Sequence, residues 1–279
     1  MLACDTVRLT GLFLYPVKSL RGLSVSSAAV DTLGLVGDRR FLVVDPTGKF
    51  LTQRGVPRMA CVSTALDATH LTLSAEGHGT IRVPLREEEM PLLRPVSVWS
   101  SEGLQAEDCG PGPAAWLSQV LGCECALVRI GAAFHRPVTK KEYAREGDRV
   151  SFADAFPFLI ASEASLARLN DQIVEAGDEP VPMDRFRPNL VVAGCGAFAE
   201  DSWARFKLGE IVFRAGGPCA RCIIATTDQQ TGERGREPLK TLARFRRDPR
   251  DPTKVLFAQN LIHETKHGSL RVGDALVVE

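Results

Sequence analysis

The segment of residues 216–222 places the tightest limits on how this chain can fold. It holds two glycines, a proline, an arginine and two cysteines within seven residues, and two positions separate the cysteines. Glycine and proline ahead of the cysteines predict a turn whose backbone can approach a ligand closely. Arg221 next to Cys222 favours the thiolate, which is the form of cysteine that binds metals. The apolar residues from Ile223 onward predict a short strand after this turn.

Taken alone, a pair of cysteines with this spacing has two simpler interpretations. It can be a reduced pair in a surface loop, or half of a structural zinc site, which needs a second pair of ligands. Cys123 and Cys125 are separated by one residue and form a poor second pair. We expect them to be small buried hydrophobic residues instead. The rest of the sequence must therefore decide what Cys219 and Cys222 do.

Composition and charge exclude several classes of protein. The 279 residues are 44% hydrophobic and 24% charged, which is ordinary for a soluble globular protein. The formal net charge is zero, so we expect neither a nucleic-acid surface nor a polybasic membrane patch. We also expect no membrane segment, because no apolar run is long enough to span a bilayer. Eight cysteines without a signal peptide indicate a reducing compartment, and we predict a cytoplasmic location.

Alternating apolar residues and regular turn signals predict that the first ~110 residues are rich in β-strands. A Gly-Pro-Gly-Pro run at residues 110–113 breaks this pattern and precedes a predicted helix at 114–121. The expected strands of this part are residues 7–15, 41–45, 49–51, 70–74, 79–85 and 96–99.

The second half of the chain mixes strands with helices. Ser162 is a good N-cap for a helix over residues 163–176, and a basic amphipathic helix is predicted at 237–246. Residues 131–149 and 246–252 are predicted loops. The fold class that follows is α/β and β-rich. The pattern places a boundary between two halves somewhere in residues 110–150, and we set the expected domains at residues 1–120 and 121–279. The expected strands of this half are residues 125–130, 156–161, 190–193, 203–206, 210–214 and 270–278.

Four stretches of the sequence combine a turn with positive charge. Arginine and lysine at strand ends suit phosphate and other anions, because a planar guanidinium can bind two oxygens at once. Each stretch alone is weak evidence, because charges beside strands are mostly exposed. Phosphate-loop, dinucleotide, serine-hydrolase and two-histidine zinc motifs are absent from the sequence. The four stretches are residues 15–19, 37–41, 185–189 and 221–222.

In their order along the chain, these stretches resemble the motifs of MOSC-domain proteins, in particular the mitochondrial amidoxime-reducing components and their bacterial relatives. The resemblance covers nearly the whole chain. It implies an N-terminal MOSC-type β-barrel domain, followed by a MOSC β-barrel domain with flanking helices. The ordered set consists of Tyr15-Pro16-Val17-Lys18-Ser19, Gly37-Asp38-Arg39-Arg40-Phe41, Phe186-Arg187-Pro188-Asn189, Cys219-Ala220-Arg221-Cys222-Ile223, Thr226-Thr227-Asp228, Thr231-Gly232 and Gly268-Ser269-Leu270-Arg271-Val272-Gly273-Asp274.

The resemblance implies that the protein binds a molybdenum cofactor. Cys222 matches the cysteine that ligates molybdenum in the family, so it is the predicted catalytic and metal-binding residue, and a thiolate is a soft ligand that suits such a metal. Arg221 precedes this cysteine as in the family, and Cys219 is expected to be a structural neighbour. Ser162 matches a Ser or Thr at a helix start, where an anion is favoured. The positions that match the family's pterin and phosphate contacts are Lys18, Ser19, Arg39, Arg187 and Asn189.

The resemblance further implies a molybdenum-dependent oxidoreductase that reduces small N-hydroxylated compounds: amidoximes, hydroxylamines and N-hydroxylated bases. Strand-like sequence begins within a few residues of Met1, and the chain stops at Glu279 without an iron–sulfur domain. We therefore expect electrons from a separate protein of the ferredoxin, flavodoxin or cytochrome/reductase type.

An alternative from a different class is a carrier of the cofactor, or of sulfur as a persulfide on Cys222, because related MOSC domains are fused to cofactor sulfurases. The full set of cations at the expected pterin site argues against this alternative. A zinc-bound pair of cysteines is the third interpretation, and it lacks a second ligand pair at suitable spacing.

Overall fold

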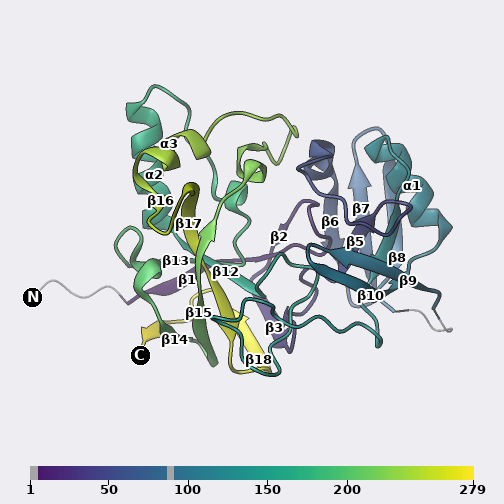
Figure 1. The fold of residues 1–279 in the computed structure, drawn as a ribbon, viewed down its shortest axis with the longest axis horizontal. Helices are drawn as coiled ribbons and strands as arrows, with labels where there is room; N and C mark the ends of the chain where they lie inside the picture. The colour runs from purple at the N-terminus through teal and green to yellow at the C-terminus, as the bar shows by residue number, and fades with distance from the viewer. Residues whose placement is uncertain (1–5, 87–90) are drawn as a thin grey trace, which may run out of the picture.

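The computed structural model describes residues 6–86 and 91–279. Two groups of β-sheets lie beside each other along the longest axis of the molecule (Figure 1). One group is built on a large sheet flanked by helices α2 and α3, and the other combines smaller sheets with helix α1. The expected β-rich α/β architecture is thereby confirmed.

The large sheet contains nine described strands, in the order β19-β14-β15-β17-β12-β13-β1-β2, with β16 beside β17. Strands β12 and β13 pair in parallel, and helix α2 lies between them in the sequence. The first strand of the chain pairs with β13, so the N-terminus is built into the second half of the molecule. The strand bounds are β1 Arg8–Leu14, β2 Leu23–Ser24, β12 Phe158–Ser162, β13 Leu190–Ala193, β14 Arg205–Leu208, β15 Ile211–Ala220, β16 Arg247–Asp248, β17 Asp251–His263 and β19 Leu276–Val278.

Two α-helices accompany the large sheet (Figure 1). The predicted helix after Ser162 is confirmed as α2, Glu163–Glu175, which buries Leu169 and Ile173. The Ser162 hydroxyl accepts a hydrogen bond from the backbone N–H of Ser165 at 3.0 Å, which is the predicted N-cap contact. Helix α3 covers Leu239–Phe245, within the predicted range. Short 3₁₀ helices are η2 Met183–Phe186, η3 Ala199–Ser202 and η4 Ile223–Thr226.

The smaller group of sheets comes mostly from the first half of the chain. It contains a four-stranded sheet in the order β5-β11-β10-β9 and a three-stranded sheet in the order β6-β7-β8. A further sheet, in the order β18-β3-β4, pairs an early strand with a late one and does not belong to this group: its Val30, Leu35 and Leu270 are buried in the core of the large sheet. The bounds are β3 Ser27–Asp31, β4 Gly34–Leu35, β5 Phe41–Val44, η1 Pro57–Cys61, β6 Ser63–Leu66, β7 His70–Ala75, β8 Gly79–Pro84, β9 Leu93–Val98, β10 Ser101–Asp108, α1 Pro111–Leu121, β11 Ala126–Arg129 and β18 Gly268–Arg271.

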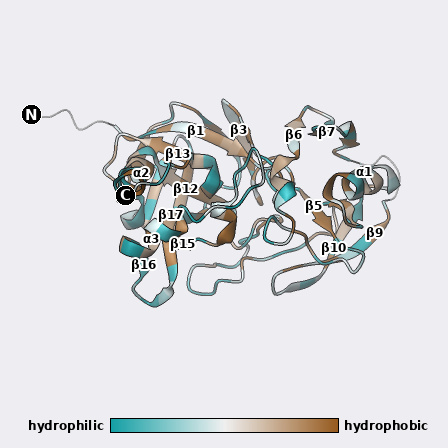
Figure 2. Ribbon diagram, turned by 90° about the horizontal axis from the view of Figure 1, so that it is seen from above, coloured by the Kyte–Doolittle hydropathy of each residue, from teal (hydrophilic) through white to brown (hydrophobic). Residues whose placement is uncertain are grey.

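Each group of sheets has its own hydrophobic core. In the large sheet, Leu12, Phe158 and Phe213 are buried together, and in the smaller group Phe41 and Leu127 belong to a separate core. The apolar residues lie mainly on the strands (Figure 2). Burial of these alternating side chains is the main contribution to the stability of the strands. The polar segments between the two cores are not needed for this packing and can form a site.

Residues 216–217, which we predicted to form a turn that approaches a ligand, lie inside strand β15 instead. A Cβ atom on Gly216 would come within 2.7 Å of the Phe156 ring, and one on Gly217 would meet the Tyr143 hydroxyl. The glycines therefore make room for aromatic rings of the segment before β12. The strand remains irregular here, because its register against β17 shifts between Ala215 and Pro218.

Two other predictions of secondary structure were wrong. The apolar residues after Cys222 form the 3₁₀ helix η4 rather than a strand, and its Ala225 and Thr226 are buried. The predicted loop at residues 246–252 contains β16 and the start of β17, which pair as a hairpin. At residues 246–252 the pairing between strands outweighs the local composition.

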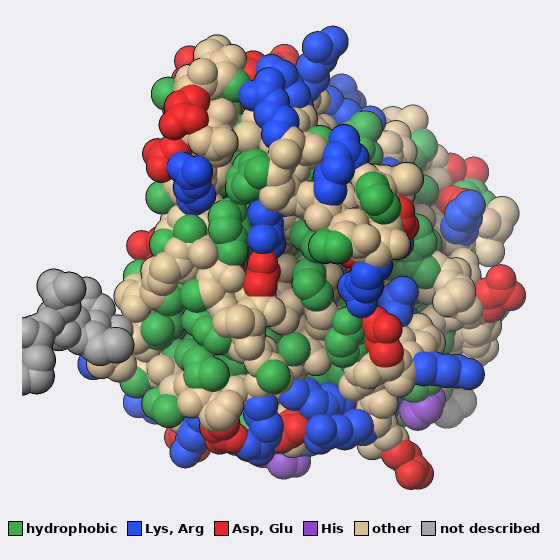
Figure 3. Space-filling model, turned by 60° about the vertical axis from the view of Figure 1, so that its left-hand side comes forward, with side chains coloured by type: hydrophobic (Ala, Val, Ile, Leu, Met, Phe, Trp, Pro, Cys, Tyr) green, Lys and Arg blue, Asp and Glu red, His purple; other side chains and the backbone are tan. Residues whose placement is uncertain are grey.

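Surface charge agrees with the balanced composition. Acidic and basic side chains lie close to one another on the face drawn in Figure 3, around apolar side chains. Among the residues that the structure describes, no helix has the length and apolar character needed to cross a membrane.

Candidate functional site

A cavity of about 170 Å³ is lined by residues from both halves of the chain. The early segments supply residues 18–19, 39 and 54, and the later ones supply residues 153–156, 186–187 and 219–222, among others. Seven of the eight predicted site residues line this cavity: Lys18, Ser19, Arg39, Arg187, Asn189, Arg221 and Cys222.

Lys18 enters the cavity from the turn after β1. Its backbone N–H donates to the carbonyl oxygen of Phe41 at 3.0 Å, which fixes the turn against β5. Its Nζ donates to the carbonyl oxygen of Phe152 at 2.9 Å and forms an ion pair with Asp154. Burial lowers the pKa of Lys18 to about 8, although the charge of Asp154 opposes this change. The ammonium group is therefore mostly charged at neutral pH and loses its charge in mildly alkaline solution.

The ring of Tyr15 holds two of the cavity's arginines. The guanidinium carbons of Arg39 and Arg187 each lie 4.3 Å from the ring centroid. The Tyr15 hydroxyl donates to the carbonyl oxygen of Pro188 at 3.1 Å. Burial raises the pKa of Tyr15 to about 12 and outweighs the two guanidinium charges, so the phenol stays neutral. Cation–π contacts contribute roughly 0.5–2 kcal/mol each, and these two restrict where both arginines can point.

Direct hydrogen bonds join Arg39 to the segment before β13. Its Nη1 donates to Oδ1 of Asn189 at 2.9 Å and to Oδ2 of Asp38 at 2.7 Å. Arg187 in turn donates from Nη2 to the carbonyl oxygen of Leu20 at 2.7 Å. Burial lowers the pKa of Arg187 to about 10, which leaves it charged at neutral pH. The two halves of the chain thus hold each other's cavity residues in place.

Unusual backbone conformations gather at this cavity. Ser19, Arg39 and Arg187 have φ angles of 68°, 46° and 54°, in the left-handed region that non-glycine residues rarely adopt. They are three of the six described non-glycine residues with positive φ. Each such residue costs on the order of 1 kcal/mol, and strain of this kind concentrates at functional sites.

Strand β15 leads directly into the cysteines of the site. Cys219 lies near its end, and Cys222 precedes η4. Arg221 donates from Nη1 to the Cys219 sulfur at 3.0 Å and from Nη2 to the carbonyl oxygen of Phe186 at 2.8 Å. Its backbone N–H donates to the carbonyl oxygen of Val255 at 2.8 Å. Arg221 therefore fixes the loop that carries Cys222 and places a positive charge beside Cys219.

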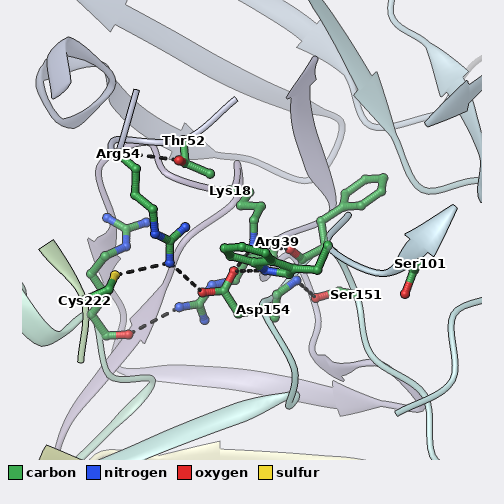
Figure 4. A network of polar contacts seen from close by, with 12 residues as sticks. Lys18, Arg39, Thr52, Arg54, Ser101, Ser151, Asp154 and Cys222 are labelled. Atoms are coloured by element: carbon green, nitrogen blue, oxygen red, sulfur yellow. Dashed lines mark hydrogen bonds and ion pairs between the residues drawn. The ribbon is translucent and has the colours of Figure 1, made fainter. Parts of the chain in front are cut away.

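Arg54 also lines the cavity, although it is not among the predicted site residues. Its Nη2 donates to the sulfur of Cys222 at 3.2 Å (Figure 4). A signal for this residue was present in the sequence, because Arg54 stands beside Gly55 shortly after a predicted strand and repeats the pattern of a turn with positive charge.

Asp154 is a second cavity residue that was not predicted, and nothing in the sequence marked this carboxylate. It accepts a hydrogen bond from the indole of Trp99 at 3.0 Å and pairs with Lys18. Burial alone would raise the pKa of Asp154, but the Lys18 ammonium, the Trp99 indole and the charge of Arg54 hold it well below its usual range. The side chain is still 56% exposed, so the carboxylate remains accessible from the cavity mouth.

Ser162 is the one predicted site residue that does not line the cavity. It is fully buried at the start of α2, where its hydroxyl lies 2.7 Å from that of Ser165. Its backbone N–H donates to Oε1 of Glu200 at 3.1 Å. The hydroxyl therefore serves the helix cap, and we leave Ser162 out of the candidate site.

The donor set of the cavity fits an anionic ligand that carries a soft metal. Five cationic side chains line it, and Asp154 is the one carboxylate among its described lining residues. Within residues 6–86 and 91–279, no three His, Cys, Asp or Glu side chains are grouped so as to hold a metal ion. Single sulfurs suit a metal whose other ligands come from an organic cofactor. The five cations are Lys18, Arg39, Arg54, Arg187 and Arg221.

Comparisons with known proteins agree with this arrangement. The family model described as "MOSC N-terminal beta barrel domain" matches residues 6–124, and the one described as "MOSC domain" matches residues 147–277. Mitochondrial amidoxime-reducing component 1 of Mus musculus is 36% identical, over 94% of this chain and 79% of the relative. Its counterpart in Homo sapiens is 35% identical, over 94% of this chain and 80% of the relative. A molybdenum cofactor sulfurase of Oryza sativa is 31% identical, over 94% of this chain and 33% of the relative.

The chain therefore belongs to the MOSC-domain family, with both the N-terminal barrel domain and the MOSC domain present. Within that family it is similar to the mitochondrial amidoxime-reducing components over nearly its full length. The division between two domains near residue 120 stays a prediction; strand β11, Ala126–Arg129, pairs with β5 and β10 in the smaller group of sheets.

Proposed function

We propose that this protein is a molybdenum-cofactor-dependent reductase of N-hydroxylated compounds, such as amidoximes, hydroxylamines and N-hydroxylated bases. The observation that carries the proposal is the convergence of five cationic side chains, from both halves of the chain, on one cavity that contains the Cys222 sulfur. The similarity to proteins named amidoxime-reducing components supports the choice of reaction.

In this proposal Cys222 ligates molybdenum and is the catalytic cysteine. Arg221 holds the loop of Cys222 through its bonds to Cys219 and Phe186. When bound, the cofactor supplies the redox chemistry that removes oxygen from the substrate, while the protein supplies binding and orientation. The residues proposed to hold the pterin and its phosphate are Lys18, Ser19, Arg39, Arg187 and Asn189.

The cation set is arranged before any ligand binds. Arg39 and Arg187 are fixed by the Tyr15 ring, and Arg39 also donates to Asn189. A phosphate that enters therefore meets donors whose side-chain freedom has already been lost in folding, which reduces the entropic cost of binding. Lys18 adds a further charge at neutral pH, because its pKa is about 8.

We also propose a separate electron-donor protein of the ferredoxin, flavodoxin or cytochrome/reductase type, and a small N-hydroxylated substrate. The support is the resemblance of the motifs around Cys222. A cytoplasmic location stays a prediction from the sequence.

A second candidate function is a carrier of the cofactor or of sulfur. It is favoured by the 31% identity to a molybdenum cofactor sulfurase, of which this chain matches about a third. In this case Cys222 would carry sulfur as a persulfide, with the sulfur supplied by a cysteine desulfurase.

The first prediction concerns Cys222 directly. The purified protein should contain molybdenum and pterin and should reduce a simple amidoxime with an artificial electron donor. The Cys222→Ser variant should lose nearly all of this activity, because a hydroxyl is a harder ligand than a thiolate. The matched control is Cys219→Ser, three positions away in the same cavity, which should retain most of the activity.

The outcomes separate the two functions. A Cys222→Ser variant that reduces the amidoxime at the wild-type rate contradicts the proposed role of this sulfur. A wild-type protein that is free of molybdenum but accepts labelled sulfur from a cysteine desulfurase would favour the carrier.

A further inference from the structure

Arg54 comes from the smaller group of sheets but lies against the sulfur of Cys222 in the larger group. The distance from Nη2 to Sγ is 3.2 Å, within hydrogen-bond range for sulfur. The Arg54 side chain is 28% exposed, so part of it reaches the cavity mouth while the rest is covered.

Two other side chains, Trp99 and Asp154, fix the guanidinium of Arg54. The contact with Asp154 is drawn in Figure 4. The central carbon of the guanidinium lies 4.7 Å from the centroid of the Trp99 ring, and Nη2 lies 3.8 Å from Oδ2 of Asp154. Trp99 and Asp154 are joined to each other by the indole hydrogen bond of 3.0 Å. Trp99 occupies the turn between β9 and β10 with a positive φ of 55°, which is an unfavourable conformation for a bulky residue.

The backbone that carries Arg54 is also attached to the second half of the chain. Arg234 donates from Nη2 to the carbonyl oxygen of Arg54 at 2.7 Å. The amide side chains of Gln53 and Gln229 exchange hydrogen bonds of 3.1 Å. The guanidinium and its backbone are therefore both held, which is the arrangement expected for a group that must keep a fixed distance to another atom.

We propose that Arg54 is a positioning residue for Cys222, and that Trp99 and Asp154 hold its guanidinium in place. Arg54 donates to the sulfur, orients it toward the cavity and withdraws part of its negative charge. The inference rests on the proposed function, in which Cys222 ligates molybdenum. Hydrogen bonds to a ligating sulfur tune the reduction potential of the metal, and fewer donors leave more negative charge on the sulfur and lower that potential.

The experiment compares three variants of the cofactor-loaded protein. Arg54→Gln removes the positive charge. Arg54→Lys keeps a positive charge but lacks the planar guanidinium group, and Arg58→Gln is a matched control. Arg58 lies four residues away and donates to the carbonyl oxygen of Val120 at 3.3 Å, outside the cavity. The readouts are molybdenum content, the midpoint potential of the bound molybdenum by spectroscopic redox titration, and kcat and KM for an amidoxime.

We expect Arg54→Gln to lower the midpoint potential and to reduce kcat about tenfold or more, with a smaller change in KM, since interactions made in the reacting state affect kcat. Arg54→Lys should recover part of the potential and of kcat. Arg58→Gln should match the wild type in all readouts. Arg54→Gln could also bind too little molybdenum for a redox titration. That loss supports the inference if the melting temperature of Arg54→Gln is unchanged and Arg58→Gln still contains molybdenum.

A further variant removes a side chain that holds the Arg54 guanidinium in place but leaves Arg54 itself unchanged. Trp99→Leu should shift the midpoint potential in the same direction as Arg54→Gln, by a smaller amount, because the guanidinium loses its ring contact. A loaded Arg54→Gln protein with wild-type potential and wild-type kcat overturns this inference alone. A wild-type protein without molybdenum overturns the proposed function, and the inference with it.

Discussion

Lys18 carries its charge into a buried position, and this determines how the site responds to pH. Its pKa falls to about 8 because burial disfavours the ammonium more than Asp154 stabilises it. An anion in the cavity would stabilise the charged form and raise this pKa again. Anion affinity is therefore linked to the protonation of Lys18.

The sign of the pH effect follows from this linkage. Below pH 8 Lys18 is charged and attracts the anion; as the pH rises through 8 and above, the charge is lost and the affinity falls. We expect the wild-type protein to retain less molybdenum after gel filtration at pH 9.5 than at pH 7. Lys18→Arg should lose less molybdenum than the wild type between these two values. The arginine keeps more of its charge at pH 9.5 than the lysine does, whereas Arg187, with a pKa of about 10, loses part of its charge in both proteins. Equal losses from both proteins at pH 9.5 would exclude Lys18 as the cause.

Single residues also show how far the sequence could predict the site. Lys18, Arg39 and Arg187 were predicted because the motifs that contain them resemble those of MOSC-domain proteins, and the structure brings all three to one cavity. Asp154 could not be predicted, because its role depends on the meeting of Lys18 and Trp99, which are far from it in sequence. Long-range contacts of this kind leave no periodicity in the chain.

Strand β15 is the element that brings the cysteines to the cavity. It pairs with β17 along most of its length, and the pairing shifts register beside Pro218. Gly216 lies at this irregular part, against the Phe156 ring, which itself lines the cavity. Packing between the strand and this ring therefore connects the stability of β15 with the shape of the site.

Gly216→Ala should lower the stability of β15 and change the shape of the site. Its Cβ would lie 2.7 Å from the Phe156 ring, and overpacking of this kind costs about 1–3 kcal/mol. We expect that loss in the free energy of unfolding from denaturant titration, together with lower molybdenum content, because the ring must move. Gly235→Ala is the control, since a Cβ there meets nothing within 4 Å. Adding Phe156→Leu to Gly216→Ala should restore stability; no recovery would contradict the clash.

The elements that were predicted well are those with a strong local pattern. Helix α2 was found from the spacing of its apolar residues and from the cap at Ser162. Strand β1 was found from its alternation. In contrast, the hairpin of β16 and β17 carries arginines and prolines, and its strands exist because they pair with each other. The local pattern therefore predicted α2 and β1 but failed for this hairpin and for the rest of β17, whose mostly buried residues 255–263 were not among the expected strands.

At the scale of the whole molecule, His263 connects two sheets. It ends β17 and is fully buried, and its Nε2 donates to the carbonyl oxygen of Asp31, at the end of β3, at 2.7 Å. Because that carbonyl can only accept, Nδ1 carries no proton, and it has no hydrogen-bond partner in the described structure. Burial, with the nearby charge of Lys266, lowers the pKa of His263 to about 4.

Acid should therefore destabilise the whole fold through this residue. The unfolded chain binds a proton at His263 near pH 6.5, whereas the folded protein binds it only near pH 4, so stability falls as the pH drops from 6.5 to 4. The loss at pH 4.5 is on the order of 2–3 kcal/mol from this group. In His263→Gln the amide can still donate to Asp31, and the difference in unfolding free energy between pH 7 and pH 4.5 should shrink by that amount. His267→Gln, at an exposed position, should leave the difference unchanged; an equal effect of both substitutions would show that burial of His263 is not the cause.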